Sequence, residues 1–296
     1  MGFTPVFEFM ASLHTYICRK SHKKIDLTST WAQETEDKLS SDLIAVLKDM
    51  KVDDDWKWTY LLVCLRPQAE QPEAFIDWFS GLTEDELETI LGRYPFPFPE
   101  DLSAYRNRMT YVLTEWNQQY FHSVDLSILE HLQQEAQHRR EQLNQSPQDE
   151  VLDDATNGLM FRPFNGLERL LLVPQFHFQP LNVILSFGDT IVCHYSARMY
   201  TGDQEYIPTH QLRVIRSLGE KNRLKIMRYL YQGPRTFIEI VRHLKLSKGI
   251  THDHLSKLRG AGLVYAHFEG ESLVEYTLRP RALEQILPNV MNYLKQ

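Results

Sequence analysis

The side chains best suited to chemistry lie close together between Ser247 and Ala261. This stretch consists of Ser-Lys-Gly-Ile-Thr-His-Asp-His-Leu-Ser-Lys-Leu-Arg-Gly-Ala, so hydroxyl, ammonium, imidazole, carboxylate and guanidinium groups outnumber its large apolar residues. Such groups donate and accept hydrogen bonds, and the cationic ones bind phosphate oxygens strongly. The stretch therefore supports recognition of a polar or anionic partner.

The elements around this stretch predict how it is presented. Ser247 is a helix N-cap and Gly262 lies at the position that ends the same helix, so residues 247–261 form one helix. Alternating apolar and polar residues on both sides of Glu269-Gly270-Glu271 predict a β-hairpin. Helices are also predicted at 214–218, at 221–231, from the cap Thr236 to Leu244, and at 281–295.

This order of elements is that of a helix-turn-helix followed by a wing. In such a domain residues 247–261 occupy the place of the recognition helix, whose N-terminal residues lie nearest the base edges of the major groove. The distribution of charge along the chain also favours an anionic partner for residues 206–296. Residues 206–296 hold 15 Lys/Arg against 7 Asp/Glu, whereas residues 1–205 hold 17 against 32. A basic domain is thus attached to an acidic one.

Two stretches resemble the ArsR-type winged-helix repressors. One is Leu218-Gly-Glu-Lys-Asn-Arg-Leu-Lys-Ile-Met-Arg-Tyr-Leu230, and the other runs from Leu246 through His254-Leu255 to Val264. The resemblance covers about residues 210–280, with helix, turn, recognition helix and wing all in register. It implies a homodimer that binds a pseudo-palindromic operator on double-stranded DNA and responds to a signal.

The resemblance also implies a role for individual residues. Lys248, His252, Asp253 and Ser256 are expected to face the groove, and His254, Lys257 and Arg259 to contact phosphates. Ile250, Leu255 and Leu258 are expected to pack inward. The full predicted DNA-binding set is Ser247, Lys248, Gly249, Thr251, His252, Asp253, His254, Ser256, Lys257, Arg259 and His267. Glu269 and Glu271 at the wing tip make further wing contacts to DNA doubtful.

The sequence gives no support for a metal, a cofactor or a catalytic centre. Metal sensors of this family use cysteines in the helix before the recognition helix, or Asp and His ligands in the closing helix. Residues 237–244 contain no cysteine, and residues 281–295 contain no histidine. The chain also lacks a glycine-rich phosphate loop, a Gly-x-Ser-x-Gly elbow and a His-Glu-x-x-His motif. We therefore predict no metal, no cofactor and no enzymatic activity.

The preceding residues predict an α+β fold, with a mainly helical N-terminal domain that ends in a small antiparallel sheet. We expect domains at 1–205 and 206–296, and a linker at 146–154. Runs of apolar residues at 169–173, 181–187 and 190–195 predict the strands. The aromatic helices could line a pocket for a small-molecule or protein effector, form a dimer interface, or make a core. Core is the default interpretation.

The remaining observations concern location and the alternative function. The 3 cysteines are widely spaced, and no signal peptide or bilayer-spanning run is evident, which favours the cytoplasm and no membrane contact. The first hypothesis is a transcriptional regulator that binds DNA as a homodimer and is controlled through residues 1–205. The alternative is an adaptor or enzyme that uses its winged helix for protein contacts.

Overall fold

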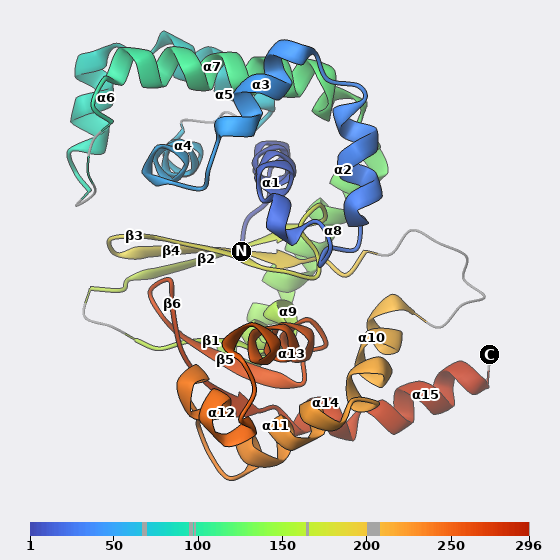
Figure 1. Cartoon of the computed structure of the whole chain (residues 1–296). Helices are drawn as coiled ribbons and strands as arrows, with labels where there is room; N and C mark the ends of the chain where they lie inside the picture. Colours follow the sequence, from blue (N-terminus) through green and yellow to red (C-terminus); the bar gives the residue numbers. More distant parts are fainter. Residues whose placement is uncertain (67–69, 95–96, 98, 164–165, 200–207, 296) are drawn as a thin grey trace. The chain divides into compact units, whose positions relative to one another are not determined.

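The computed structural model describes residues 1–66, 70–94, 97, 99–163, 166–199 and 208–295. The chain divides into two compact units. We call residues 1–140 and 166–197 the N-terminal unit, and residues 141–165 and 198–296 the C-terminal unit. Both combine helices with a three-stranded sheet (Figure 1), which confirms the predicted α+β class.

The helices of the N-terminal unit begin at local signals that the sequence shows. Pro5 opens the first helix, Asp53 and Asp101 cap later ones, and Thr83 forms a capping box with Glu86. The elements are α1 (Pro5–Ile17), η1 (Arg19–Ser21), α2 (Thr28–Glu36), α3 (Ser41–Asp49), α4 (Asp54–Leu65), α5 (Pro72–Gly81), α6 (Glu84–Leu91), α7 (Leu102–Gln119), η2 (Phe121–Ser123) and α8 (Leu126–Leu143), which continues into the C-terminal unit. None of the described helices is both long enough and apolar enough to cross a bilayer.

The sheet of this unit contains β2 (Arg169–Gln175), β3 (Val183–Phe187) and β4 (Thr190–Ser196), in the order β2-β4-β3. The three strands lie where the sequence predicts them. The prediction of a purely antiparallel sheet is wrong, however, because β4 lies between the other two strands and pairs in parallel with β2. Only the hairpin of β3 and β4 is antiparallel.

Aromatic side chains form the core of the N-terminal unit. Helix α1 packs against β2, α4 and α5, and almost all of its side chains are buried. Trp56 and Trp116 are buried and donate to His14 and Ser12 of this helix, and Trp58 is also buried. The aromatic helices thus make a core, which was the default interpretation of their spacing.

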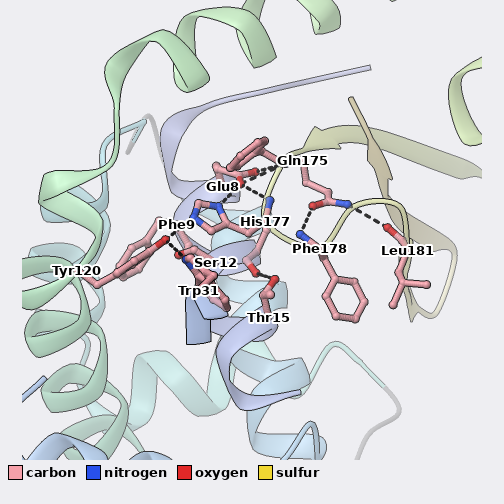
Figure 2. Close-up of polar contacts among 12 residues, drawn as sticks. Glu8, Phe9, Ser12, Thr15, Trp31, Tyr120, Gln175, His177, Phe178 and Leu181 are labelled. Atoms are coloured by element: carbon pink, nitrogen blue, oxygen red, sulfur yellow. Dashed lines mark hydrogen bonds and ion pairs between the residues drawn. The ribbon is translucent and has the colours of Figure 1, made fainter. Parts of the chain in front are cut away.

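One polar group inside this core holds a loop in place (Figure 2). The Glu8 carboxylate is fully buried and accepts hydrogen bonds from the backbone N–H groups of Phe176 and His177 and from His177 Nδ1. The other ring nitrogen, Nε2, lies 2.7 Å from the Tyr120 hydroxyl, which also accepts from Trp31 Nε1 at 2.7 Å. Gln175 binds the backbone of Phe178 and of Leu181. These bonds satisfy the polar groups of the loop that leads from β2 to β3.

The C-terminal unit contains the predicted winged helix and two elements that were not predicted. Its elements are α9 (Gln148–Thr156), β1 (Leu159–Phe161), α10 (Thr209–Leu218), α11 (Lys221–Tyr231), α12 (Phe237–Leu244), α13 (Lys248–Gly260), β5 (Val264–Glu269), β6 (Ser272–Leu278), α14 (Pro280–Glu284) and α15 (Ile286–Leu294). Its sheet has the order β1-β5-β6, with β1 parallel to β5 and β6 antiparallel to it. The hairpin of β5 and β6 is the predicted wing.

Two sequence expectations about the region before β2 need correction. The predicted linker at 146–154 is helical, because Pro147 precedes α9 and its acidic first turn suits a helix N-terminus. The units also differ from the predicted domains 1–205 and 206–296, since β1 pairs with β5 and carries residues 141–165 into the C-terminal unit. The predicted boundary itself lies outside the described residues.

Two buried histidines give the N-terminal unit a predictable response to acid. Burial lowers the pKa of His14 to about 4, and burial together with His14 lowers the pKa of His194 to about 3. The unfolded chain, with a histidine pKa of about 6.5, binds these protons at higher pH than the folded unit. The stability of the unit therefore falls as pH drops from about 6.5 towards 4.

We expect the thermal midpoint of the N-terminal unit to fall by at least about 5 °C between pH 7 and pH 5. Tryptophan fluorescence reports this midpoint selectively, because every tryptophan lies in this unit. His194→Phe should reduce the fall, since it removes a group that titrates, whereas His122→Gln changes an exposed histidine and serves as the control. An equal fall in wild type and His194→Phe would contradict this account.

Candidate nucleic-acid interface

The turn between α12 and α13 is fixed by local interactions. Thr236 and Glu239 form a capping box at the start of α12, and Lys245 ends this helix in a left-handed conformation with φ 55°. The Ser247 side chain then accepts a hydrogen bond from the Ile250 N–H at 3.3 Å and starts α13. Gly262, with φ 66°, follows the end of α13. The predicted caps are confirmed, and the helix-turn-helix results from them.

Helix α13 has one buried face. Thr251, Leu255 and Leu258 lie four and three residues apart and are 0%, 1% and 0% exposed. Because such spacing places side chains on one side of a helix, this face packs against the rest of the unit. The opposite face is left open to a partner.

The open face carries most of the residues predicted to face the groove. Lys248, Gly249, His252 and Lys257 are exposed, and Asp253 and Ser256 are half-buried. The Asp253 carboxylate lies 2.7 Å from Lys257 Nζ, one helical turn away. This pairing offsets the repulsion that an isolated aspartate would exert on phosphates.

Two residues of the predicted DNA-binding set do not lie on the open face. Thr251 is fully buried, since it shares the inward side of α13 with Leu255. His254 is 9% exposed, and its Nδ1 lies 3.5 Å from the Glu220 carboxylate. Neither side chain can reach a phosphate without rearrangement, so these two assignments are wrong for this structure. Arg259 is half-buried, with its guanidinium 5.6 Å from the centre of the Phe268 ring.

Ile250 also differs from its prediction. It was expected to pack inward with Leu255 and Leu258, but it is 50% exposed. The buried face is centred on Thr251, and each residue turns the helix by about 100°, so Ile250 lies at the edge of that face. The exposed surface at the start of α13 therefore contains an apolar side chain.

The wing keeps its predicted shape but offers little positive charge. His267 lies in β5 with its Nε2 2.9 Å from the Thr277 hydroxyl of β6, and burial lowers its pKa. Glu269 and Glu271 flank Gly270 at the tip, where φ of 58° suits glycine. His267 is thus used within the hairpin and stands apart from the exposed residues of α13.

Sequence reasoning omitted two exposed basic residues near the start of α13. Arg242 lies in the last turn of α12, and Lys245 lies in the turn between the helices. The sequence signal that could have identified them is a basic residue in or beside the turn of a helix-turn-helix. Tyr229 and His243 stack at 3.8 Å beside them, and the Arg235 guanidinium lies 4.6 Å from the Tyr229 ring centre.

The structure also bears on metal ligands. Within the described ranges, no three His, Cys, Asp or Glu side chains gather in a way that could hold a metal ion. His177 is bound to Glu8 and Tyr120, whereas the ring of His194 packs against Phe7 and Tyr60. These two histidines therefore have different neighbours.

Comparison with known proteins supports the same part of the chain. The family model described as "Bacterial regulatory protein, arsR family" matches residues 220–266, from the cap of α11 into β5. A probable mercury resistance operon repressor of Streptomyces lividans is 31% identical over 80 residues, which are 27% of this chain. The aligned part spans 64% of the length of that relative. No solved structure matched the chain. The C-terminal region therefore carries an ArsR-type helix-turn-helix, as predicted.

The start of α13 should respond in opposite directions to two substitutions. Ser247→Ala removes the cap and should cost about 1 kcal/mol of local stability. Gly249→Ala should add about 0.5–1 kcal/mol, because a Cβ at Gly249 meets nothing within 4 Å and alanine is the better helix former.

Hydrogen–deuterium exchange of peptides from 248–260 measures both effects. Protection should fall about fivefold in Ser247→Ala and rise in Gly249→Ala. Ser272→Ala, an exposed serine in the wing, is the control. Unchanged exchange in Ser247→Ala would show that the cap does not hold the helix.

Proposed function

We propose that this protein is a DNA-binding transcriptional regulator that represses its target by placing α13 in the major groove of an operator. The observation that carries the proposal is the open face of α13, which follows an ArsR-type turn and presents Lys248, His252 and Ser256 at intervals of one helical turn. These side chains donate and accept hydrogen bonds at base edges. The excess of basic residues in 206–296 favours approach to a polyanion.

The proposed contacts fall into two groups. Lys248, His252, Asp253 and Ser256 read the bases, while Ser247 and Gly249 let the backbone N–H groups at the start of α13 approach a phosphate. Lys257 and Arg259 add charge contacts at the helix flank, and we include Arg242 and Lys245 with them. His267 contributes only if the hairpin contact with Thr277 opens.

We propose that the regulator binds DNA as a homodimer. In α14 and α15 the apolar residues Leu283, Ile286 and Val290 are half-buried within the unit. A different stripe is exposed on α15: Leu287 is 68% exposed, Met291 43% and Leu294 68%. An apolar stripe at this spacing suits a second copy of the same helix. A pseudo-palindromic operator requires the two α13 helices of such a dimer to lie roughly 34 Å apart.

We infer that residues 1–205 control DNA binding through a small-molecule or protein effector. The name of the relative mentions mercury, but we do not propose mercury as the signal for this chain. Its cysteines are Cys18, Cys64 and Cys193, and none lies in the matched residues 220–266.

One observation favours a second function, an adaptor that binds protein through the winged helix. The wing tip carries Glu269 and Glu271, and Ile238 and Ile250 are 40% and 50% exposed near the candidate DNA surface. Acidic and apolar groups suit a protein partner better than a phosphate backbone. Strong preference for operator DNA over scrambled DNA favours the regulator, whereas weak and equal binding to both favours the adaptor.

The double variant Lys248→Ala/His252→Ala should lose about 100-fold or more in affinity for its operator, because each base contact contributes about 1–3 kcal/mol. Fluorescence anisotropy on duplex DNA from the region upstream of its own gene, against a scrambled duplex and over a salt series, measures this loss. Arg281→Ala/Lys295→Ala removes two exposed charges outside α13 and should bind nearly as well as wild type. Full-strength binding by the α13 variant would refute the groove assignment.

The dimer proposal makes a separate prediction. Light scattering after size exclusion should give twice 34.9 kDa for wild type and 34.9 kDa for Leu287→Glu/Met291→Glu, because two charges in an apolar interface are costly. Leu126→Glu places a charge on an exposed leucine of α8 and should remain dimeric. A monomeric wild-type protein would show that this stripe has another use.

A further inference from the structure

A partly open cavity of about 140 Å³ is formed within the C-terminal unit. Its walls come from α9, α10, the end of α13, and α14 with α15. It is distinct from the open face of α13, and none of the residues predicted to bind DNA lines it. An engineered apolar cavity of about 150 Å³ holds one benzene, so this one suits a ligand of about that size.

Much of the cavity lining is polar. Arg198, His210 and Arg279 line the cavity together with Asp154. The Arg279 guanidinium is held in place, because its Nε lies 2.7 Å from an Asp153 carboxylate oxygen and its Nη1 donates to the backbone oxygen of Gly262 at 3.1 Å. The Arg198 guanidinium donates to the Asp154 backbone oxygen and lies 3.8 Å from the Asp154 carboxylate.

The surroundings of His210 keep its imidazole uncharged. The pKa of His210 is lowered to about 4, first by burial and then by Arg198, Arg213 and Arg279, and Asp154 opposes them only in part. The imidazole is therefore neutral at pH 7. A neutral imidazole donates through one ring N–H, which suits an acceptor such as a carboxylate oxygen.

Apolar side chains also line the cavity, among polar ones such as Gln211, Gln285 and Asn289. Val214 and Ile215 of α10 face it from one side, and Ala282, Ile286 and Val290 face it from α14 and α15. A ligand that contacts both the arginines and the apolar side chains carries an anionic group on a compact apolar body. Planar donors of arginine match the two oxygens of a carboxylate.

We propose that this cavity binds a small organic carboxylate, with its carboxylate between Arg198, His210 and Arg279 and its apolar body against Ile286 and Val290. Binding leaves both reactants chemically unchanged. The site belongs to the C-terminal unit and is separate from any effector of residues 1–205.

The position of the cavity links it to the recognition helix. Ala261, the last residue before the glycine that ends α13, lies on the cavity wall, and Arg279 holds the carbonyl of that glycine. An occupied cavity joins α10 and α15 to the end of α13. The effect of the carboxylate on operator affinity rests on the proposed function, whereas binding of the carboxylate does not.

Isothermal titration calorimetry of the full chain with benzoate tests the binding itself. We expect saturable binding with a Kd of about 1 mM or tighter, which is within reach of a ligand of this size. Benzamide has the same shape without the charge and should bind at least about tenfold more weakly, because the hydrogen bonds to the carboxylate are charge-assisted. No saturation by about 10 mM benzoate, or equal binding of the two compounds, overturns the proposal.

Variants place the binding in the cavity. Val290→Trp should fill the cavity from α15 and abolish benzoate binding, and Arg198→Gln should weaken it about tenfold or more. Arg281→Gln removes an exposed arginine that does not line the cavity and should bind as wild type. Circular dichroism confirms that each variant is folded. Unchanged binding in both cavity variants overturns the site, and if Val290→Trp fails to fold, Arg198→Gln alone decides.

Anisotropy with operator DNA in the presence of benzoate examines the link to α13. A change in operator affinity in wild type that is absent in Arg198→Gln supports the link. Benzoate binding without any change in operator affinity overturns the link and leaves the binding site standing. Absence of DNA binding in every variant would refute the proposed function and not the carboxylate site.

Discussion

A buried ion pair between Asp153 and Arg279 connects α9 to the residue that follows the wing. Both side chains are almost inaccessible, and Arg279 also donates to Asn157 Oδ1 and to the carbonyl of Gly262. Gly262 itself has no room for a side chain, because a Cβ there would lie 2.0 Å from Asn157 Oδ1. A charge left alone at this place would be costly, so α9, the end of α13 and the wing must come together. The place of the recognition helix depends on this junction.

The sequence predicted those parts of the C-terminal unit that depend on neighbouring residues. Thr236, Ser247 and Gly262 act within one turn of their own helices, so the helix ends and the wing could be predicted. The rotation of α13 could be predicted only roughly, and an error of one residue, about 100°, misplaced Ile250 and Thr251. Helix α9 and strand β1 were missed because their partners lie about a hundred residues further along the chain.

The N-terminal unit shows the same division between local and distant information. Its helices and strands follow from caps and apolar runs, but the parallel pairing of β2 with β4 does not, since adjacent runs usually form hairpins. The buried Glu8 was also beyond prediction, because the donors that satisfy it, at Phe176 and His177, are remote in sequence. In the structure this carboxylate holds a loop, and a group already committed to three hydrogen bonds is poorly placed to act as a base.

Strand β1 has a consequence for how the molecule is made. The chain leaves the N-terminal unit after residue 140, returns at 166 and leaves again after 197. Each unit is therefore built from two separate stretches of sequence. During synthesis β1 leaves the ribosome long before β5, its partner, exists. Its hydrogen-bonding edge must wait unpaired until residues 264–269 are complete, so assembly of the winged helix follows the synthesis of β5. A fragment that begins at residue 206 would lack this strand altogether.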